Sequence, residues 1–513
     1  MSIIDQLAAD IADHGNRHVF GITGSGLTLT LLDALEKRQV EPVRTYFEGS
    51  AALMAGTVGR LSGRSGVAYG IKGPGLANMV PGMTASFLDA FPMVAIVEAY
   101  APAFGPDKAH KRLNHQLLTG AVCKAVRALS DGGPNFTAMA ALAEAEVPGP
   151  VVLELAGGGL TSQPELPQID NISEDDNELI RLLENAQRPA IIAGSLAFRK
   201  GWQEELARLH IPVFSTTAAK GIVDERAVNA AGVYTGVGLE LTAERMILPQ
   251  ADLIIGIGLR PNEVLATKAF HCTSVNIDST KVPGVDIFAF KATTTSVSPR
   301  LWALLKQKSW GLDELAECLH GQDKVMLQGF LPGIAFRSIE DVLGRKIRMV
   351  MDTGYFCTIG EHAWKAPNAN LCLLSGQGRY MGTSIPMAIG AAIYDPSVSV
   401  VAVAGDGGIS MYLAEIRIAV ERQLPILFVL MSDGCYGSVS TRAIQDGLTR
   451  TPIDMKTPSW MKVMEGLGLN SWVVDSPEAL QDALRVWAKT NAPGYLEINF
   501  SRIPYEKMCA GIR

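Results

Sequence analysis

The stretch from Val398 to Gly437 reads VSVVAVAGDGGISMYLAEIRIAVERQLPILFVLMSDGCYG and decides the fold of this chain. It begins with an apolar, mostly β-branched run, Val398 to Ala404, which is typical of a parallel strand buried on both faces. Met411 to Gln423 has apolar residues at helical spacing, and Leu424-Pro425 ends this helix before a second apolar strand, Ile426 to Met431. The pattern predicts an open α/β sheet of parallel strands.

Each of these two strands ends in an acidic turn. Gly405-Asp406-Gly407 follows the first strand, and Asp433 follows the second. Because the carboxyl ends of neighbouring parallel strands meet at one edge of a sheet, where ligands collect, both carboxylates are expected there. A hard cation such as Mg²⁺ takes oxygen ligands together with phosphate oxygens, so the pattern favours a magnesium-bound diphosphate. A glycine-rich turn also closes strands for conformational reasons alone, and that alternative stays open.

The block from Gly405 to Val439 resembles the cofactor-binding motif of the thiamine diphosphate (ThDP) enzymes, in the group that contains acetolactate synthase, pyruvate decarboxylase and benzoylformate decarboxylase. The resemblance implies ThDP bound with Mg²⁺, which the Asp406 and Asp433 carboxylates and the backbone carbonyl of Cys435 would hold. The family usually has asparagine in place of Asp433, but Mg²⁺ accepts either oxygen ligand. The resemblance also assigns the other residues of the two turns to cofactor binding: Gly405, Gly407, Gly408, Tyr436 and Gly437.

A glutamate near the amino terminus, Glu48, lies in PVRTYFEGSAALMAG, between an expected strand and an alanine-rich helix. An acid there is also typical of an exposed helix start that the helix dipole stabilises. The family carries a glutamate at the end of a strand in its first domain. The resemblance therefore implies that Glu48 binds N1′ of the aminopyrimidine ring of the cofactor and acts in proton transfer. The small, apolar residues around Glu48 predict a carboxylate held away from water.

Two further segments of the first domain follow in the order found in the family. VFGITGSG (residues 19–26) resembles its first strand and turn, and IKGPGLANMVPGM (residues 71–83) resembles its Gly-Pro-Gly loop. The second of these assigns Gly73 and Asn78 to cofactor binding.

A segment of the last domain, GQGRYMGTSIPMAIGAAI (residues 376–393), resembles the part of the family that covers the cofactor ring. This assigns Arg379 and Met381 to cofactor binding. Met381 takes the place of the bulky apolar residue that bends the cofactor, although a methionine in an apolar run is also typical of a protein core.

The residues expected on the substrate side are Ser25, Lys72, His110 and Lys111. Ser25 matches a serine that contacts the substrate carboxylate in benzoylformate decarboxylase, and it is equally suited to a turn. Lys72, in a loop expected to line the cleft, favours a substrate with a second anionic group, such as a sulfonate, phosphonate or carboxylate. His110 and Lys111 are equally consistent with a solvated surface. His115 is expected on a helix surface, with proton transfer as the alternative.

The resemblance implies an enzyme that removes CO₂ from a 2-oxo acid. The resulting carbanion would be protonated by a decarboxylase, or would add to a second carbonyl in an acetolactate synthase-like carboligase. Lys111 stands where carboligases carry a glutamine, and SDGCYG is similar to the decarboxylase pattern, so a decarboxylase is the main interpretation. The carboligase is the first alternative. A non-catalytic cofactor-binding homologue is the second, which the presence of Glu48 and Asp406 disfavours.

A chain of 513 residues is too long for one hydrophobic core and predicts about three domains. A pyrimidine-binding domain is expected over residues 1–160, a central Rossmann-like domain over 178–310, and a diphosphate-binding domain over 345–513, with a linker at 161–177. Each is expected to be a doubly wound parallel α/β domain. The resemblance implies a homodimer or homotetramer with active sites at the subunit interface.

Composition excludes several classes of partner. A net charge of −7 provides no basic patch for nucleic acid. No run approaches about 18 apolar residues and no basic segment precedes an apolar one at the amino terminus, so a cytoplasmic protein without membrane spans is expected. Seven scattered cysteines predict reduced thiols. FAD, which some relatives bind, is not expected because Gly256 and Gly258 do not form a phosphate-binding glycine fingerprint.

Overall fold

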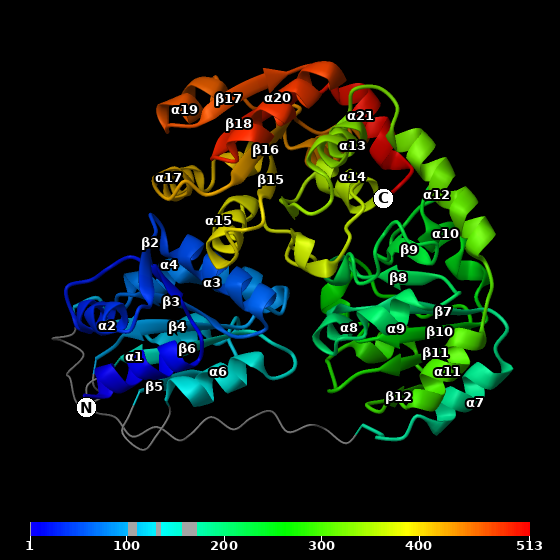
Figure 1. The fold of residues 1–513 in the computed structure, drawn as a ribbon, viewed down its shortest axis with the longest axis horizontal. Coiled ribbons are helices and arrows are strands. Elements are labelled where there is room, and N and C mark those ends of the chain that lie inside the picture. The colour runs from blue at the N-terminus through cyan, green and yellow to red at the C-terminus, as the bar shows by residue number, and fades with distance from the viewer. Residues whose placement is uncertain (1, 101–109, 130–134, 156–171) are drawn as a thin grey trace. The chain divides into compact units, whose positions relative to one another are not determined.

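The computed structural model describes residues 2–100, 110–129, 135–155 and 172–513. Within these residues the chain forms three six-stranded sheets flanked by helices, and the strands of each sheet pair in parallel (Figure 1). The predicted fold class, three doubly wound parallel α/β sheets, is confirmed.

The first sheet has the strand order β2-β1-β3-β4-β6-β5. Helices α1, α2 and α6 share one hydrophobic cluster with strands of this sheet, and α3 packs on its central strands and against α4. A capping box between Ser2 and Asp5 starts the first helix. The elements are α1 (Ile3–Asp13), β1 (His18–Gly21), α2 (Leu27–Glu36), β2 (Glu41–Arg44), α3 (Glu48–Ser62), β3 (Gly66–Gly70), α4 (Pro74–Leu88), β4 (Met93–Glu98), α5 (His115–Thr119), β5 (Val126–Ala128), α6 (Phe136–Glu144) and β6 (Pro150–Leu155).

The second sheet has the order β12-β11-β10-β7-β8-β9, in which the first and fourth strands along the chain, β7 and β10, are neighbours. Its elements are α7 (Asn177–Asn185), β7 (Pro189–Ala193), α8 (Ser195–Arg199), α9 (Gln203–Ala207), β8 (Val213–Ser215), η2 (Thr217–Ala219), β9 (Ala230–Val233), α10 (Ala243–Met246), η3 (Leu248–Gln250), β10 (Leu253–Ile257), η4 (Pro261–Glu263), β11 (Thr273–Ile277), η5 (Val285–Phe288), β12 (Ala292–Thr294), α11 (Pro299–Gln307) and α12 (Leu312–Met326).

The third sheet has the order β14-β13-β15-β16-β18-β17, and α13, α14, α20 and α21 share a hydrophobic cluster with its strands. Its elements are α13 (Pro332–Leu343), β13 (Arg348–Met351), α14 (Tyr355–Ala363), η6 (Ala369–Leu371), β14 (Cys372–Leu374), α15 (Ser384–Tyr394), β15 (Val400–Gly405), α16 (Asp406–Ile409), η7 (Leu413–Glu415), α17 (Ile416–Glu421), β16 (Ile426–Ser432), α18 (Gly437–Gln445), α19 (Trp460–Gly466), β17 (Asn470–Val474), α20 (Pro477–Thr490), β18 (Gly494–Asn499) and α21 (Arg502–Ala510).

The chain divides into two compact units. The first comprises residues 1–168 with two segments from the last third of the chain, 385–397 and 412–424. Within this unit, Gly390 of α15 lies against Met54 of α3, where an added Cβ would come within 2.9 Å of the Met54 backbone. The second unit contains the second and third sheets.

The structure corrects one element of the decisive stretch. The helix predicted over residues 411–423 is shorter, with one turn at η7 followed by α17. Glu415, at the junction, is buried and accepts the backbone N–H of Tyr46 at 3.2 Å. Most of the predicted linker, residues 161–171, lies outside the described residues.

The cysteines are free thiols, of which five are buried and Cys272 and Cys318 are half-buried. Among the described residues, no helix is long and apolar enough to cross a membrane.

Candidate active site

The two acidic turns of the third sheet meet as predicted. Asp406 follows β15 and Asp433 follows β16, and these two strands are paired. Asp406 is buried, and its carboxylate accepts the Ser432 hydroxyl at 2.7 Å and the backbone N–H groups of Asp433 and Gly434 at 2.9 and 3.0 Å. One carboxylate thereby ties together the carboxyl ends of both strands.

The second turn is held by its own acid. Asp433 Oδ1 accepts the backbone N–H of Cys435 at 3.2 Å, and Cys435 itself is buried. An added Cβ at Gly437 would lie 2.7 Å from Asp433 Oδ2. The three predicted metal ligands therefore lie in adjoining turns, with two carboxylates and one carbonyl among them.

A cavity of about 100 Å³ opens at these turns. At Gly407 and Gly408 an added Cβ would lie 2.4 Å from a ring carbon of Tyr436 and 1.9 Å from Asp352 Oδ2, so only glycine allows this close packing. Among the described residues no group of three His, Cys, Asp or Glu side chains is placed to hold a metal. A cation here would need phosphate oxygens as further ligands, so the donor set fits a magnesium-bound diphosphate. The lining residues include Thr353, Gly354, Tyr355, Phe356, Met381, Gly405, Asp406, Gly407, Gly408, Asp433, Cys435, Tyr436, Gly437 and Tyr505.

Met381 lines this cavity, and a residue absent from the sequence-based prediction holds its loop. Asp352, at the end of β13, accepts the backbone N–H of Gly382 at 2.6 Å and that of Thr353 at 2.9 Å. Burial raises the pKa of the Asp352 carboxyl to about 7. In the sequence, Asp352 is marked only by its place directly after the apolar segment that forms β13.

Asp352→Asn is expected to change how stability depends on pH. The folded protein holds this proton more tightly than an ordinary carboxyl with a pKa of 3.8, so Asp352 lowers the free energy of unfolding as the pH rises from about 4 to about 7. Asparagine does not titrate, so the variant should gain up to about 4 kcal/mol relative to the unchanged protein across this window. Urea unfolding of both proteins at about pH 4.5 and pH 8 measures the gain. If the free energies of unfolding of the variant and the unchanged protein differed by the same amount at both pH values, the expectation would be wrong.

Arg379, predicted to bind the cofactor, points its guanidinium elsewhere. Nη2 donates to Glu361 Oε1 at 2.6 Å and Nε donates to the carbonyl of Gly376 at 3.1 Å. Burial alone would raise the pKa of Glu361, but the guanidinium groups of Arg379 and Arg513 lower it to about 2. Arg379 thus fixes the loop before Met381, and its side chain is not among those that line the cavity.

In the first unit, Glu48 is buried at the first position of α3. Its Oε2 accepts the Asn78 side-chain amide at 3.0 Å. Added Cβ atoms at Gly70 and Gly75 would lie 3.8 Å from Glu48 Cγ and 3.7 Å from Oε1, so small residues flank the carboxylate. The structure therefore brings two predicted residues together and places Glu48 away from water.

Lys72 has its own carboxylate partner. Nζ lies 3.1 Å from Glu98 Oε2 and 5.2 Å from the ring centre of Tyr100. Glu98 Oε1 accepts the N–H and hydroxyl of Thr28 at 3.0 and 2.8 Å. Burial opposes ionisation of Glu98, but the bonds from Thr28 and Lys72 lower its pKa below the ordinary value. Lys72 is thus a largely neutralised cation.

His115, expected on a helix surface, is instead buried and holds the Gly-Pro-Gly loop. Its Nε2 accepts the backbone N–H of Gly73 at 3.2 Å, and its Nδ1 lies 2.8 Å from Glu154 Oε1. Because Nε2 accepts, the proton must sit on Nδ1 and point to Glu154. Helix α5 is short and capped by Asn114, so its first residue faces inward, which periodicity could not indicate.

The other substrate-side residues lie at the surface. The side chains of Ser25, His110 and Lys111 are exposed. Lys111 lies close to the loop at its backbone, since an added Cβ at Gly73 would lie 1.9 Å from the Lys111 carbonyl oxygen. A cavity of about 480 Å³ is lined by Lys72, Tyr100, Arg112, His115, Gln116, Glu154 and neighbouring residues.

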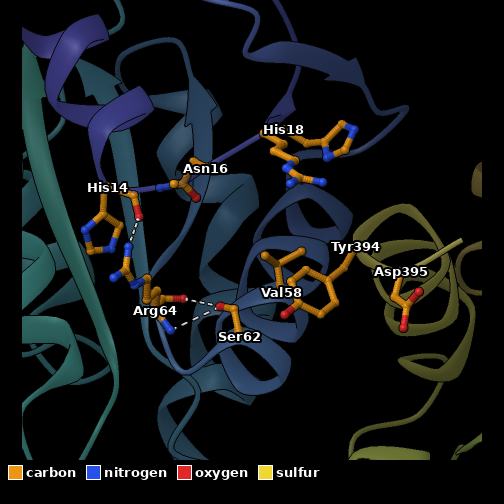
Figure 2. A pocket seen from close by; sticks show the side chains of 10 residues that line it. His14, Asn16, His18, Val58, Ser62, Arg64, Tyr394 and Asp395 are labelled. Carbon is orange, nitrogen blue, oxygen red and sulfur yellow. Dashed lines mark hydrogen bonds between the residues drawn. The ribbon is translucent and has the colours of Figure 1, made fainter.

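A further cavity of about 440 Å³ lies in the same unit at the amino end of β1, where Arg64 donates to the carbonyl of His14 at 2.8 Å (Figure 2). It contains none of the predicted site residues, which follow the carboxyl ends of the strands. Its lining residues are His14, Gly15, Asn16, Arg17, His18, Val58, Ser62, Arg64, Tyr394 and Asp395.

Known proteins similar to this chain include acetolactate synthases. The catabolic acetolactate synthase of Raoultella terrigena is 26% identical over 96% of this chain and 94% of its own length. The acetolactate synthase of Bacillus subtilis (strain 168) is 23% identical over 95% and 91%, and the isozyme 2 large subunit of Escherichia coli (strain K12) is 24% identical over 95% and 94%.

Three family models match successive parts of the chain. The N-terminal TPP binding domain of thiamine pyrophosphate enzymes matches residues 1–106, the central domain matches 177–291, and the C-terminal TPP binding domain matches 352–498. The first and last matches contain Glu48 and the two acidic turns. The chain belongs to the thiamine pyrophosphate enzymes.

Proposed function

We propose that the protein is a ThDP- and Mg²⁺-dependent carboligase of the acetolactate synthase type. It would remove CO₂ from a 2-oxo acid and join the remaining acyl group to a second carbonyl compound. The similarity to acetolactate synthases over nearly the whole chain favours this reading over the simple decarboxylase.

One feature of the substrate side supports the carboligase. Lys111 stands where carboligases carry a glutamine, but His115-Gln116, five residues later, has the same histidine-glutamine order. The buried His115 and the exposed Gln116 both line the cavity beside Lys72. A glutamine is therefore available on the substrate side.

The residues present fit the cofactor. Asp406, Asp433 and the Cys435 carbonyl would hold Mg²⁺, and Gly407 and Gly408, which line the cavity at these turns, would face the diphosphate. When bound, ThDP supplies the electron sink for the carbanion that remains after CO₂ leaves.

The chain's other residues would position groups and move protons. Glu48, buried and bonded to Asn78, would exchange a proton with N1′ of the aminopyrimidine. Asp352 and Arg379 hold the loop that carries Met381, which would cover the cofactor ring.

Product analysis by NMR tests the proposal. The protein with ThDP and Mg²⁺ is incubated with pyruvate, benzoylformate, sulfopyruvate or phosphonopyruvate, each with and without an aldehyde or a second 2-oxo acid. A coupled hydroxy ketone or hydroxy acid that forms from two carbonyl compounds supports the carboligase. An aldehyde and CO₂ as sole products in every mixture would overturn it in favour of the decarboxylase.

Lys72 provides a test of the predicted second substrate anion. Because Glu98 already neutralises Lys72, we expect Lys72→Ala to leave the ratio of KM values for dianionic and monoanionic 2-oxo acids within about twofold. The variant should instead lose about 1–3 kcal/mol of stability, since Glu98 loses a partner. Steady-state kinetics with sulfopyruvate and pyruvate measure the ratio. The double variant Lys72→Met/Glu98→Gln, which removes both charges, is the control and should regain stability.

We also propose that the protein is a cytoplasmic homodimer or homotetramer. Three apolar side chains on helix α18 and the loop after it, Val439, Ile444 and Leu448, are each at least half exposed. This helix directly follows the turn that contains Asp433. Such a surface favours contact with another subunit. Light scattering after size-exclusion chromatography should report two or four chains per particle.

A further inference from the structure

The central sheet has the strand arrangement of a dinucleotide-binding domain. Its order, β12-β11-β10-β7-β8-β9, is the sixth, fifth, fourth, first, second and third strand along the domain. The chain therefore leaves the neighbouring strands β7 and β10 in opposite directions. In such sheets a crevice opens at the carboxyl ends of these two strands, and nucleotides bind there. The function proposed above assigns no ligand to the central domain. Whether a nucleotide can bind there depends on which side chains occupy this crevice.

A side chain of the protein occupies one half of the crevice. Glu263, in the turn after β10, is 2% exposed and folds back onto the end of β7. Its Oε2 accepts the Ser195 backbone N–H at 2.8 Å and the Thr216 hydroxyl at 2.6 Å, and its Oε1 accepts the Ser195 hydroxyl at 2.5 Å. These donors follow β7 and β8, where phosphate oxygens of a nucleotide would be expected.

The backbone around Glu263 is closed as well. An added Cβ at Gly194 would lie 2.2 Å from the Gly258 carbonyl oxygen and 2.7 Å from Glu263 Oε2. Gly194, directly after β7, thus packs against the backbone of Gly258 and against the Glu263 carboxylate.

The other half of the crevice is filled by an ion pair. Arg260 follows β10 and Asp278 follows β11, and both are buried. Arg260 donates from Nε to Asp278 Oδ2 at 2.9 Å and from Nη2 to Oδ1 at 2.6 Å. The bidentate pair leaves neither group turned outward to a ligand.

We propose that Glu263 is an internal anion that occupies the phosphate position of the central domain, so that this domain takes neither a flavin nor another dinucleotide. A diphosphate would need the donors that Glu263 already holds, and its charges would stand within hydrogen-bond range of a buried carboxylate. The proposal does not depend on which reaction the protein catalyses.

Chemical rescue of Glu263→Ala tests this assignment in the full chain. The variant leaves the Ser195 and Thr216 donors buried without an acceptor, so its thermal midpoint should fall. Sodium acetate or inorganic phosphate should then raise the Tm by roughly 2–4 °C more than sodium chloride at equal ionic strength. Ile255→Ala is the matched control, because Ile255 is a buried residue of β10 whose truncation frees no donor. Equal anion effects on both variants would overturn the proposal.

A second measurement needs no variant. Equilibrium dialysis of the unchanged protein against micromolar FAD and ADP should show no stoichiometric binding of either. Binding of FAD or ADP at one per chain would overturn the proposal even if Glu263→Ala failed to fold. Loss of catalytic turnover would not bear on it, so its failure and that of the proposed function can be told apart.

Discussion

Glu48→Gln is expected to lower kcat by about 10²- to 10⁴-fold, because the group would lose its ability to exchange a proton with the aminopyrimidine ring. The substitution keeps the size of the side chain and its contact with Asn78, so the fold and the affinity for ThDP should change little. Initial rates of 2-oxo acid consumption measure kcat, and isothermal titration measures ThDP binding. A large loss of kcat with nearly unchanged ThDP affinity is the expected pair of results.

The matched control is Glu415→Gln. Glu415 is a buried carboxylate in the same unit that binds the backbone of Tyr46, and burial raises its pKa. Its substitution should reduce stability without a loss of kcat near 100-fold. If Glu48→Gln and Glu415→Gln had equal kinetic effects, Glu48 would be a structural carboxylate and the proton-transfer role would be wrong.

Asp406→Asn is expected to raise the Kd for Mg²⁺, measured at a fixed ThDP concentration, by about 100-fold or more. The carboxylate accepts three hydrogen bonds, and an amide in its place would direct an NH₂ group at one set of those donors. The variant would therefore lose a metal ligand and also loosen the ends of β15 and β16. Titration with Mg²⁺, followed by calorimetry, gives the Kd.

Asp433→Asn is the control for this prediction. Asparagine is the usual residue of the family at this position, and its side-chain oxygen can still accept the Cys435 N–H. Mg²⁺ affinity should stay within about tenfold of the unchanged protein. A stronger effect at Asp433 than at Asp406 would show that the two carboxylates have exchanged the roles assigned to them.

Some site residues could be placed from the sequence and others could not, because only some positions depend on local pattern alone. Local apolar periodicity was enough to place Asp406 and Asp433 at strand ends, whereas the roles of these residues and of Glu48 came from the family resemblance. The parallel arrangement of β15 and β16 then brings the two turns together.

Arg379 and His115 show the limit of that reasoning. Whether a side chain points into a cavity depends on partners far along the chain, Glu361 for Arg379 and Gly73 for His115. Neither pairing has a periodic signal, and a surface loop with the same residues would look identical in sequence. Asp352, whose bond to Gly382 spans 30 residues, was missed for the same reason.

The fold class, the order of the motifs and the acidic turns could be predicted, because they depend on hydrophobic periodicity and on turn chemistry within a few neighbouring residues. The ion pair of Lys72 with Glu98 and the bond of Glu263 to Ser195 could not, because both depend on long-range packing. Glu263 and Ser195 are 68 residues apart, and the packing of β7 beside β10 is what brings the carboxylate to its donors.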